Sequence, residues 1–205
     1  TFKIPHLLIA LDSGVTPDTN KTFKWDGTPQ PLKGWERDHT YRGLLLDSVV
    51  PVFQGFARQI GETRERAYLQ KFHYGNADVG GGIDRFWLDG ALRISAAEQI
   101  AFLYQLYNNQ IEAKPEFQWR TKDAMLIEAT DTYVLRGKTG YSLGMPGTGD
   151  RSKPGVGWWV GWIEAGTHTH VFAANFDIND ENDLPKRKSL PLTIFQAEGW
   201  LSAVR

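Results

Sequence analysis

The stretch Thr132-Tyr133-Val134-Leu135-Arg136-Gly137-Lys138-Thr139-Gly140 decides how the rest of this chain is interpreted. In its first half, apolar residues alternate along the chain, and many residues are β-branched or aromatic. Both features are typical of a strand. Lys138-Thr139-Gly140 is therefore expected to end a strand at the mouth of a hairpin. A glycine there lets a ligand approach the backbone, and the ammonium and hydroxyl groups can bind an anion. By itself, however, this tripeptide is more often an ordinary turn.

A second run, Val156-Gly157-Trp158-Trp159-Val160-Gly161-Trp162-Ile163, predicts the strand that pairs with the first. A third strand is expected after it, so the strands cover about 132–140, 156–164 and 168–176. A closing helix is expected to begin at Lys186 and to run through Leu192, Phe195 and Leu201.

The chain opens with a predicted helix. Residues 1–14 carry an apolar stripe of helical spacing, and Gly14 ends it. Because proline is tolerated only in the first turn of a helix, Pro5 places the start at or near residue 1. Residues 15–39 are polar and rich in turn formers, and we expect Trp25 and Trp35 to pin this long loop to the body of the protein.

More helices are expected between residues 40 and 130. Ser95-Ala96-Ala97-Glu98 is a capping box, a pattern in which two side chains satisfy backbone donors at a helix start. The expected helices cover about 40–46, 50–60, 62–72, 95–109 and 115–129.

Helices that come first and antiparallel hairpins that come last predict an α+β domain, an antiparallel sheet flanked by helices with a helical subdomain. We expect one domain over 1–205, mostly helical from about 15 to 130. Sheet hairpins and the C-terminal helix then form 131–205. The chain begins inside a structured element without an initiator Met, so we expect further strands of the sheet upstream of Thr1.

Composition narrows the functional classes. A chain of 205 residues with 41% hydrophobic content can bury a substantial core. Its 23 basic and 24 acidic residues leave a net charge of -1, which gives no footprint for nucleic acid or for an anionic membrane. No stretch is long and apolar enough to span a bilayer, and no signal peptide is visible. The expected partner is a small molecule.

The residues that bind metals are sparse. Cysteine is absent, which excludes disulfides, thiol nucleophiles and thiolate metal sites. His168 and His170 alternate on one strand face and could hold zinc, but Thr167 and Thr169 beside them favour a solvated hairpin tip. No metal is predicted.

Seven motifs, taken together and in order, resemble the class D β-lactamases, the oxacillinase-type serine enzymes of the penicillin-recognising fold. That family has Ser-x-x-Lys, Ser-x-Val, Tyr-Gly-Asn, a Trp, Lys-Thr-Gly, a Gly-Trp-Trp-Val-Gly-Trp strand and a late Arg. The corresponding residues here are Thr1-Phe2-Lys3, Ser48-Val49-Val50, Tyr74-Gly75-Asn76, Trp87, Lys138-Thr139-Gly140, Gly157 to Trp162, and Arg187. The ordered set is far more specific than any one member.

The resemblance implies that the nucleophile is a serine directly before Thr1. Thr1 itself is an alternative, since an N-terminal threonine can use its own amine as a base. That alternative leaves the other motifs without a role, so we favour the serine.

The resemblance also implies a role for Lys3. Apolar neighbours disfavour a charged amine, and Phe2, Ile4, Val50 and Trp87 are candidates for that lining. The neutral amine is expected to add carbon dioxide, supplied as bicarbonate, and to serve as a carbamate base in acylation and deacylation. Trp87 is expected to donate its indole N–H to this carbamate. No bound organic cofactor is implied.

The remaining roles follow the family in the same way. Ser48 would pass a proton to the lactam nitrogen with Lys138 nearby, and the backbone N–H of Tyr141 would help bind the oxyanion. Substrate binding would fall to Thr139, Gly140, Arg187 and Val50. Without the motif order, simpler roles remain open: Trp87 as a core aromatic, Ser48 as a helix cap, and Arg187 as part of a solvated basic helix start. His6 is expected to pack.

These expectations predict a periplasmic hydrolase of the β-lactam ring that confers antibiotic resistance, as a monomer or a homodimer. The main rival is a β-lactam-sensing receptor domain, which is acylated but does not turn over. A cell-wall transpeptidase is a third possibility, weakened by the compact single domain. The glycine-rich span 142–154 is expected to rim the cleft.

Overall fold

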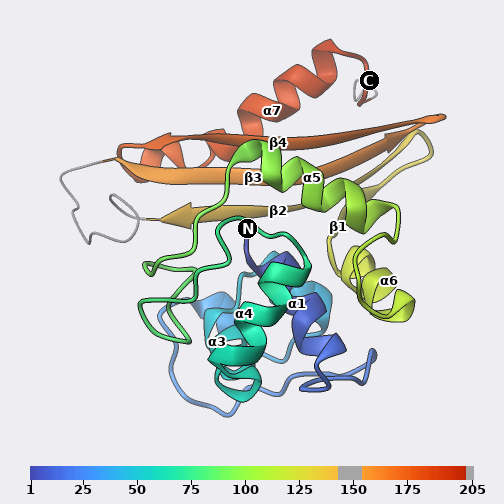
Figure 1. Ribbon diagram of the computed structural model, residues 1–205. Coiled ribbons are helices and arrows are strands. Elements are labelled where there is room, and N and C mark those ends of the chain that lie inside the picture. Colours follow the sequence, from blue (N-terminus) through green and yellow to red (C-terminus); the bar gives the residue numbers. More distant parts are fainter. Residues whose placement is uncertain (143–153, 202–205) are drawn as a thin grey trace.

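The computed structural model describes residues 1–142 and 154–201, so most of the glycine-rich span 142–154 lies outside the described residues. In the described part, a four-stranded antiparallel sheet in the order β1-β2-β3-β4 lies between one C-terminal helix and a layer of helices (Figure 1). The α+β class is confirmed.

The strands are β1 (Leu126–Ala129), β2 (Tyr133–Ser142), β3 (Gly155–Ala165) and β4 (His168–Ile178). The helices are α1 (Lys3–Asp12), α2 (Tyr41–Leu46), α3 (Val50–Ile60), α4 (Glu62–Lys71), α5 (Ala96–Tyr107), α6 (Pro115–Ala124) and α7 (Lys186–Ala197). Two short 3-10 helices cover Lys33–Trp35 and Glu181–Asp183.

Strand β3 divides the core in two because successive side chains point to opposite faces of a sheet. Val160 and Trp162 join the core cluster of the helical layer, whereas Trp159 and Ile163 pack in a second cluster with Phe195 of α7. The sheet is therefore covered on both faces, which explains why β3 reads as a nearly continuous apolar run.

Helix α1 occupies the centre of the helical layer. Its residues from Leu7 to Leu11 have no exposed surface, so this helix is buried on all sides. Its N-terminal end rises toward the sheet, with the chain start lying between the helices and β2 (Figure 1). A Cβ built on Gly140 of β2 would lie 2.7 Å from the main-chain nitrogen of Thr1. The close approach requires glycine at this position.

Most predicted elements are confirmed within a few residues, and the capping box is formed: the Ser95 hydroxyl accepts from the Glu98 N–H, and the Glu98 carboxylate accepts from the Ser95 N–H. One element was wrong. The helix expected to continue to about residue 129 ends at Ala124, and Leu126–Ala129 forms strand β1. Pairing of β1 with β2 along the sheet edge overrides the local helical pattern.

The two tryptophans of the first loop differ. Trp35 packs against the core and donates its indole N–H to the Asp47 carbonyl at 2.8 Å, as expected of an anchor. Trp25 is 38% exposed and donates to Thr28 in its own loop, so its predicted anchoring role was wrong. At the β3–β4 hairpin, His168 is exposed as expected, but His170 stacks on Trp200 with ring centroids 3.9 Å apart.

The tightest strand contact gives a stability prediction. A Cβ on Gly161 would lie 2.0 Å from the Arg136 carbonyl oxygen and 2.6 Å from the Gly137 Cα. Gly161→Ala should therefore lower the free energy of unfolding by roughly 1–3 kcal/mol, measured by urea denaturation. The control is Gly55→Ala on α3, where a Cβ meets nothing within 4 Å and stability should stay equal or rise. A Gly161→Ala protein as stable as the wild type would contradict this register.

Candidate active site

Ser48 lies in the turn between α2 and α3, with a φ of 55°. A positive φ is uncommon for a non-glycine residue and is found where the surrounding structure fixes it. The Ser48 hydroxyl accepts a hydrogen bond from the Lys138 ammonium at 2.5 Å. Helix α3 is capped by Val49 without any side-chain hydrogen bond, so the alternative of Ser48 as a helix cap is wrong. Its hydroxyl is used toward the sheet instead.

Lys138 enters this site from β2 and is 4% exposed. Its ammonium also donates to the Thr139 carbonyl at 2.9 Å. Burial, together with the nearby charges of Lys3 and Arg187, lowers the pKa of Lys138 to about 7. An amine with a pKa near neutrality can both give and take a proton at physiological pH.

Lys3 lies in the first turn of α1 and is 8% exposed. Burial lowers the pKa of this amine to about 8. Its Nζ lies 5.6 Å from the centroid of the Phe53 ring, an aromatic residue of α3. Two members of the apolar lining predicted for Lys3, Phe2 and Ile4, are buried. The dry environment expected for Lys3 is therefore present.

Trp87 and Val50 are the two other residues predicted to line Lys3, and both are half-buried. The Trp87 indole packs against Phe2, with ring centroids 5.5 Å apart, and against Phe86 at 4.9 Å. Its Nε1–H is buried and has no hydrogen-bond partner among the described residues. Buried indole N–H groups are usually hydrogen-bonded, so this donor is available for a ligand or a modified side chain. Val50 lies in the first turn of α3, two residues after Ser48.

Thr1 is held against the sheet by a residue that the sequence reasoning missed. Gln99 of α5 is 1% exposed, and its amide nitrogen donates to the Thr1 hydroxyl at 2.6 Å and to the Tyr74 hydroxyl at 3.2 Å. Tyr74 belongs to the Tyr-Gly-Asn motif, which thus supports the start of the chain. The signal available in the sequence was a glutamine on the apolar face of the predicted helix 95–109.

The main-chain nitrogen of Thr1 lies close to the cations of the site. This nitrogen is buried, and the charges of Lys138, Lys3 and Arg187 lie near enough to act on it. Together with the contact at Gly140, this places Thr1 where three of the predicted site residues converge.

Arg187 comes from α7 but reaches the end of β2. Its guanidinium donates to the Gly140 carbonyl at 3.1 Å and lies 5.8 Å from the Tyr141 ring centroid. The side chain is half-buried, so the alternative of a solvated basic helix start is wrong for this arginine. Thr139 is half-buried beside it. The structure therefore brings the predicted residues of β2, α1, α7 and the Ser48 turn to one place.

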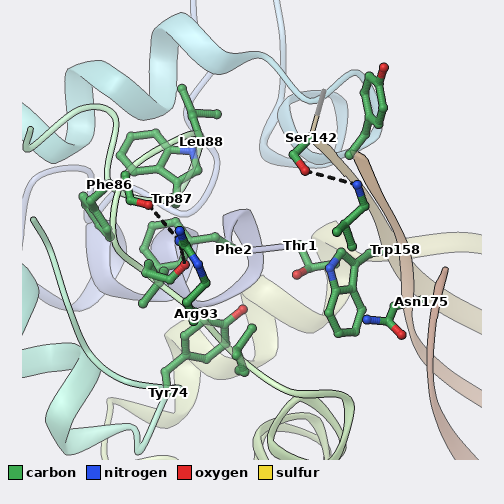
Figure 2. Close-up of a pocket in the computed structure, with 15 residues that line it drawn as sticks. Thr1, Phe2, Tyr74, Phe86, Trp87, Leu88, Arg93, Ser142, Trp158 and Asn175 are labelled. Atoms are coloured by element: carbon green, nitrogen blue, oxygen red, sulfur yellow. Dashed lines mark hydrogen bonds between the residues drawn. The ribbon is translucent and has the colours of Figure 1, made fainter. Parts of the chain in front are cut away.

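A cavity of about 270 Å³ lies next to these groups (Figure 2). Its lining includes Thr1, Phe2, Tyr74, Trp87, Tyr141 and Trp158. Figure 2 shows Thr1 and Trp158 on one side of the cavity and the Phe86-Trp87-Leu88 segment on the other. Among the described residues, Lys3, Ser48 and Lys138 do not belong to this lining, whereas their neighbours Thr1, Phe2 and Tyr141 do.

Comparison with known proteins gives the family. Residues 1–196 match the model of the penicillin binding protein transpeptidase domain. The chain belongs to this family. It is 50% identical over 199 residues to Beta-lactamase OXA-10 of Pseudomonas aeruginosa, a match that covers 97% of this chain and 73% of that protein. It is 46% identical over 198 residues to Beta-lactamase OXA-48 of Klebsiella pneumoniae, covering 97% and 72%.

A third relative, Beta-lactamase OXA-2 of Salmonella typhimurium, is 41% identical over 198 residues, which cover 96% of this chain and 68% of that protein. These matches confirm the resemblance to class D β-lactamases and the fold that it implies. In residues 1–142 and 154–201 no helix has the length and apolar character needed to cross a bilayer. The same residues hold no cluster of three or more potential metal-ligating His, Asp or Glu side chains.

The depressed lysine pKa values predict how stability depends on pH. The pKa of Lys3 is about 8 in the folded protein against a usual 10.5, so the unfolded chain binds more protons between these values. Stability therefore rises with pH across this window. Lys3→Met removes the cost of a buried charge and should be more stable than wild type at pH 7, by on the order of 2–3 kcal/mol. The difference should shrink toward pH 10.

The free energy of unfolding of wild type and of Lys3→Met is measured by urea denaturation across pH 7–10, in buffer depleted of carbon dioxide. Lys24→Met is the matched control, because the Lys24 ammonium is 77% exposed. If the free energies of unfolding of Lys3→Met and wild type differed by the same amount from pH 7 to pH 10, the buried amine would not be the cause of the pH dependence.

Proposed function

We propose that this protein hydrolyses the β-lactam ring of penicillin-type antibiotics through a serine acyl-enzyme. The observation that carries the proposal is a pair of dry lysines, one donating to Ser48 and the other lying among aromatic rings. Relatives that are 50% identical are named β-lactamases, which favours hydrolysis over the sensor domain. Confinement to the periplasm and a role in antibiotic resistance belong to the same proposal.

The nucleophile of this proposal is a serine directly before Thr1. A residue there stands three positions before Lys3, and residues three apart on a helix share a face. The main-chain nitrogen of Thr1 lies against Gly140 and near the charges of Lys138, Lys3 and Arg187. The Thr1 hydroxyl is already engaged by Gln99, which disfavours Thr1 itself as the nucleophile.

Lys3 is proposed as the general base of both halves of the reaction. Carbon dioxide, added to the Lys3 amine as a carbamate, supplies an anionic oxygen that can accept protons. The residues around Lys3 fit such a group, because burial favours the neutral amine that adds carbon dioxide. The buried and unpartnered Nε1–H of Trp87 supplies a donor for a carbamate oxygen.

Ser48 and Lys138 are proposed to deliver a proton to the lactam nitrogen when the ring opens. The ammonium donates to the Ser48 hydroxyl, so the hydroxyl can pass on its own proton while it receives one from Lys138. The pKa of Lys138 of about 7 suits this transfer near neutral pH.

The end of β2 is proposed to bind the substrate. The Thr139 hydroxyl and the Arg187 guanidinium would hold the carboxylate common to these antibiotics, since guanidinium groups bind carboxylates strongly. Gly140 leaves room for the acyl group beside the strand, and Val50 keeps the Ser48 side of the site apolar. The Tyr141 backbone N–H would donate to the oxyanion, a contact typically worth about 2.7–4 kcal/mol of barrier.

Carbon dioxide provides the first test of this function. Nitrocefin turnover by the full-length protein should fall on carbon dioxide depletion and recover with bicarbonate. Trp87→Phe should lower turnover by about tenfold or more, and added bicarbonate should restore part of it, because one charge-assisted hydrogen bond is lost. Trp25→Phe, which changes an exposed indole, should behave as wild type.

The variant Lys3→Ala tests the role of Lys3 as base while leaving the proposed nucleophile in place. Any enzyme acylated in this variant should remain acylated, and intact-mass spectrometry would show the adduct. Full-rate hydrolysis by Lys3→Ala, or wild-type turnover indifferent to carbon dioxide, would remove Lys3 as a carbamate base.

Arg187 gives a prediction for substrate binding. Arg187→Ala should lower kcat/KM by about 10- to 100-fold, mainly through a higher KM, since a hydrogen bond to a charged group contributes about 1.5–3 kcal/mol. Steady-state kinetics with benzylpenicillin measures this. Lys186→Ala is the control, because that neighbouring lysine is paired with Asp183 at 2.6 Å. An unchanged KM in Arg187→Ala would show that Arg187 does not hold the substrate.

A further inference from the structure

A buried histidine–glutamate pair lies one helical turn beyond Lys3. The Nε2 atom of His6 on α1 is 2.8 Å from the Oε1 atom of Glu65 on α4, and neither side chain has any exposed surface. Neither side chain has another hydrogen-bond partner among the described residues. Each is therefore the nearest polar partner that the structure gives the other.

Such a pair is unusual as a device for stability alone. Taking a carboxylate and an imidazole out of water costs free energy that their attraction only partly returns, and apolar residues of similar volume often give equal or greater stability. His6 was expected to pack, and its burial confirms that. Packing does not explain why a buried carboxylate faces it.

The neighbours of His6 connect the pair to Lys3. The imidazole ring lies 5.0 Å from the Trp87 indole and 5.6 Å from the Phe53 ring, measured between centroids. Phe53 is the ring that lies beside the Lys3 Nζ, and Trp87 carries the unpartnered indole N–H. His6 therefore contacts two aromatic side chains of the proposed lysine site, while Glu65 fixes its position from another helix.

We propose that His6, oriented by Glu65, is a positioning residue that holds Trp87 and Phe53 around the Lys3 amine and so raises the affinity of that amine for carbon dioxide. This inference rests on the proposed function of Lys3. In the reaction, Nζ bonds to the carbon of carbon dioxide, one carbon–oxygen π bond opens, and nitrogen releases one proton to solvent. The carbamate keeps a single negative charge, and an indole N–H fixed in place lowers its free energy.

The pair acts through position because its own charges contribute little to the amine. Desolvation is the one cause that lowers the pKa of Lys3, with no contribution from Glu65 or His6. A change at Glu65 should therefore leave the basicity of Lys3 nearly unchanged and alter the alignment of the rings that surround it.

The test measures carbamate formation directly in full-length protein. Samples are titrated with ¹³C-bicarbonate at fixed pH, and the carbamate carbon signal is followed by NMR. The Trp87 indole signal, assigned with Trp87→Phe, reports the same event. Glu65→Gln keeps the shape of the side chain and removes its charge. It should raise the bicarbonate concentration for half-saturation by about fivefold or more. Nitrocefin turnover at saturating bicarbonate should recover.

Tyr68→Phe is the matched control. The Tyr68 hydroxyl donates to Asp12 at 3.0 Å and so joins the same two helices, α4 and α1, through a different pair of residues. The bicarbonate concentration that half-saturates Tyr68→Phe should stay within about twofold of the wild-type value. The double variant His6→Leu/Glu65→Leu replaces the pair by apolar residues, which keeps the core folded if Glu65→Gln is unstable. This double variant should also show weakened carbamate formation.

The outcomes are distinct. A wild-type carbamate signal with equal half-saturation in folded Glu65→Gln, or in the double variant, would overturn the positioning role and leave the proposed function intact. A wild-type protein without any carbamate signal would overturn the base assigned to Lys3 and this inference together. Weaker carbamate formation in the pair variants, with Tyr68→Phe unchanged, supports the inference.

Discussion

The exclusion of water from two lysine amines is the constraint on which the rest of the site depends. Lys3 arrives on the most deeply buried of the described helices, and Lys138 arrives on β2, an interior strand of the sheet, where it is itself buried. Neither amine could lose its proton near neutral pH on a solvated loop, because hydration stabilises the ammonium form. The two-layer core is thus the reason that ordinary lysines become groups able to exchange protons.

The second requirement is that the backbones of neighbouring segments approach each other closely, and the sheet register provides for this. Gly140 lets the chain start lie against β2, and Gly161 lets β2 and β3 pair where a larger residue would meet the Arg136 carbonyl. The same register directs Lys138 toward Ser48, whose backbone lies in a conformation that few residues adopt. Gly140 and the positive φ of Ser48 thus lie where helix, strand and turn meet.

The sequence predicted the class of fold and most element positions, because periodicity and capping patterns are local. It failed at Leu126–Ala129, where pairing with a strand edge replaces a helical pattern, and at Trp25, whose solvent-facing loop no local rule predicts. The ordered motifs placed Lys3, Ser48, Lys138 and Arg187 together. The contacts of Gln99 and of the His6–Glu65 pair were not predicted, because each joins residues distant in sequence and belongs to no motif.

The cavity wall and the buried lysines are formed by different residues. Leu88, Val156 and Asn175 line the cavity, whereas Lys3 and Lys138 are not among its lining residues. A substitution in that wall can therefore change the shape of the cavity without replacing either amine or the aromatic ring beside Lys3.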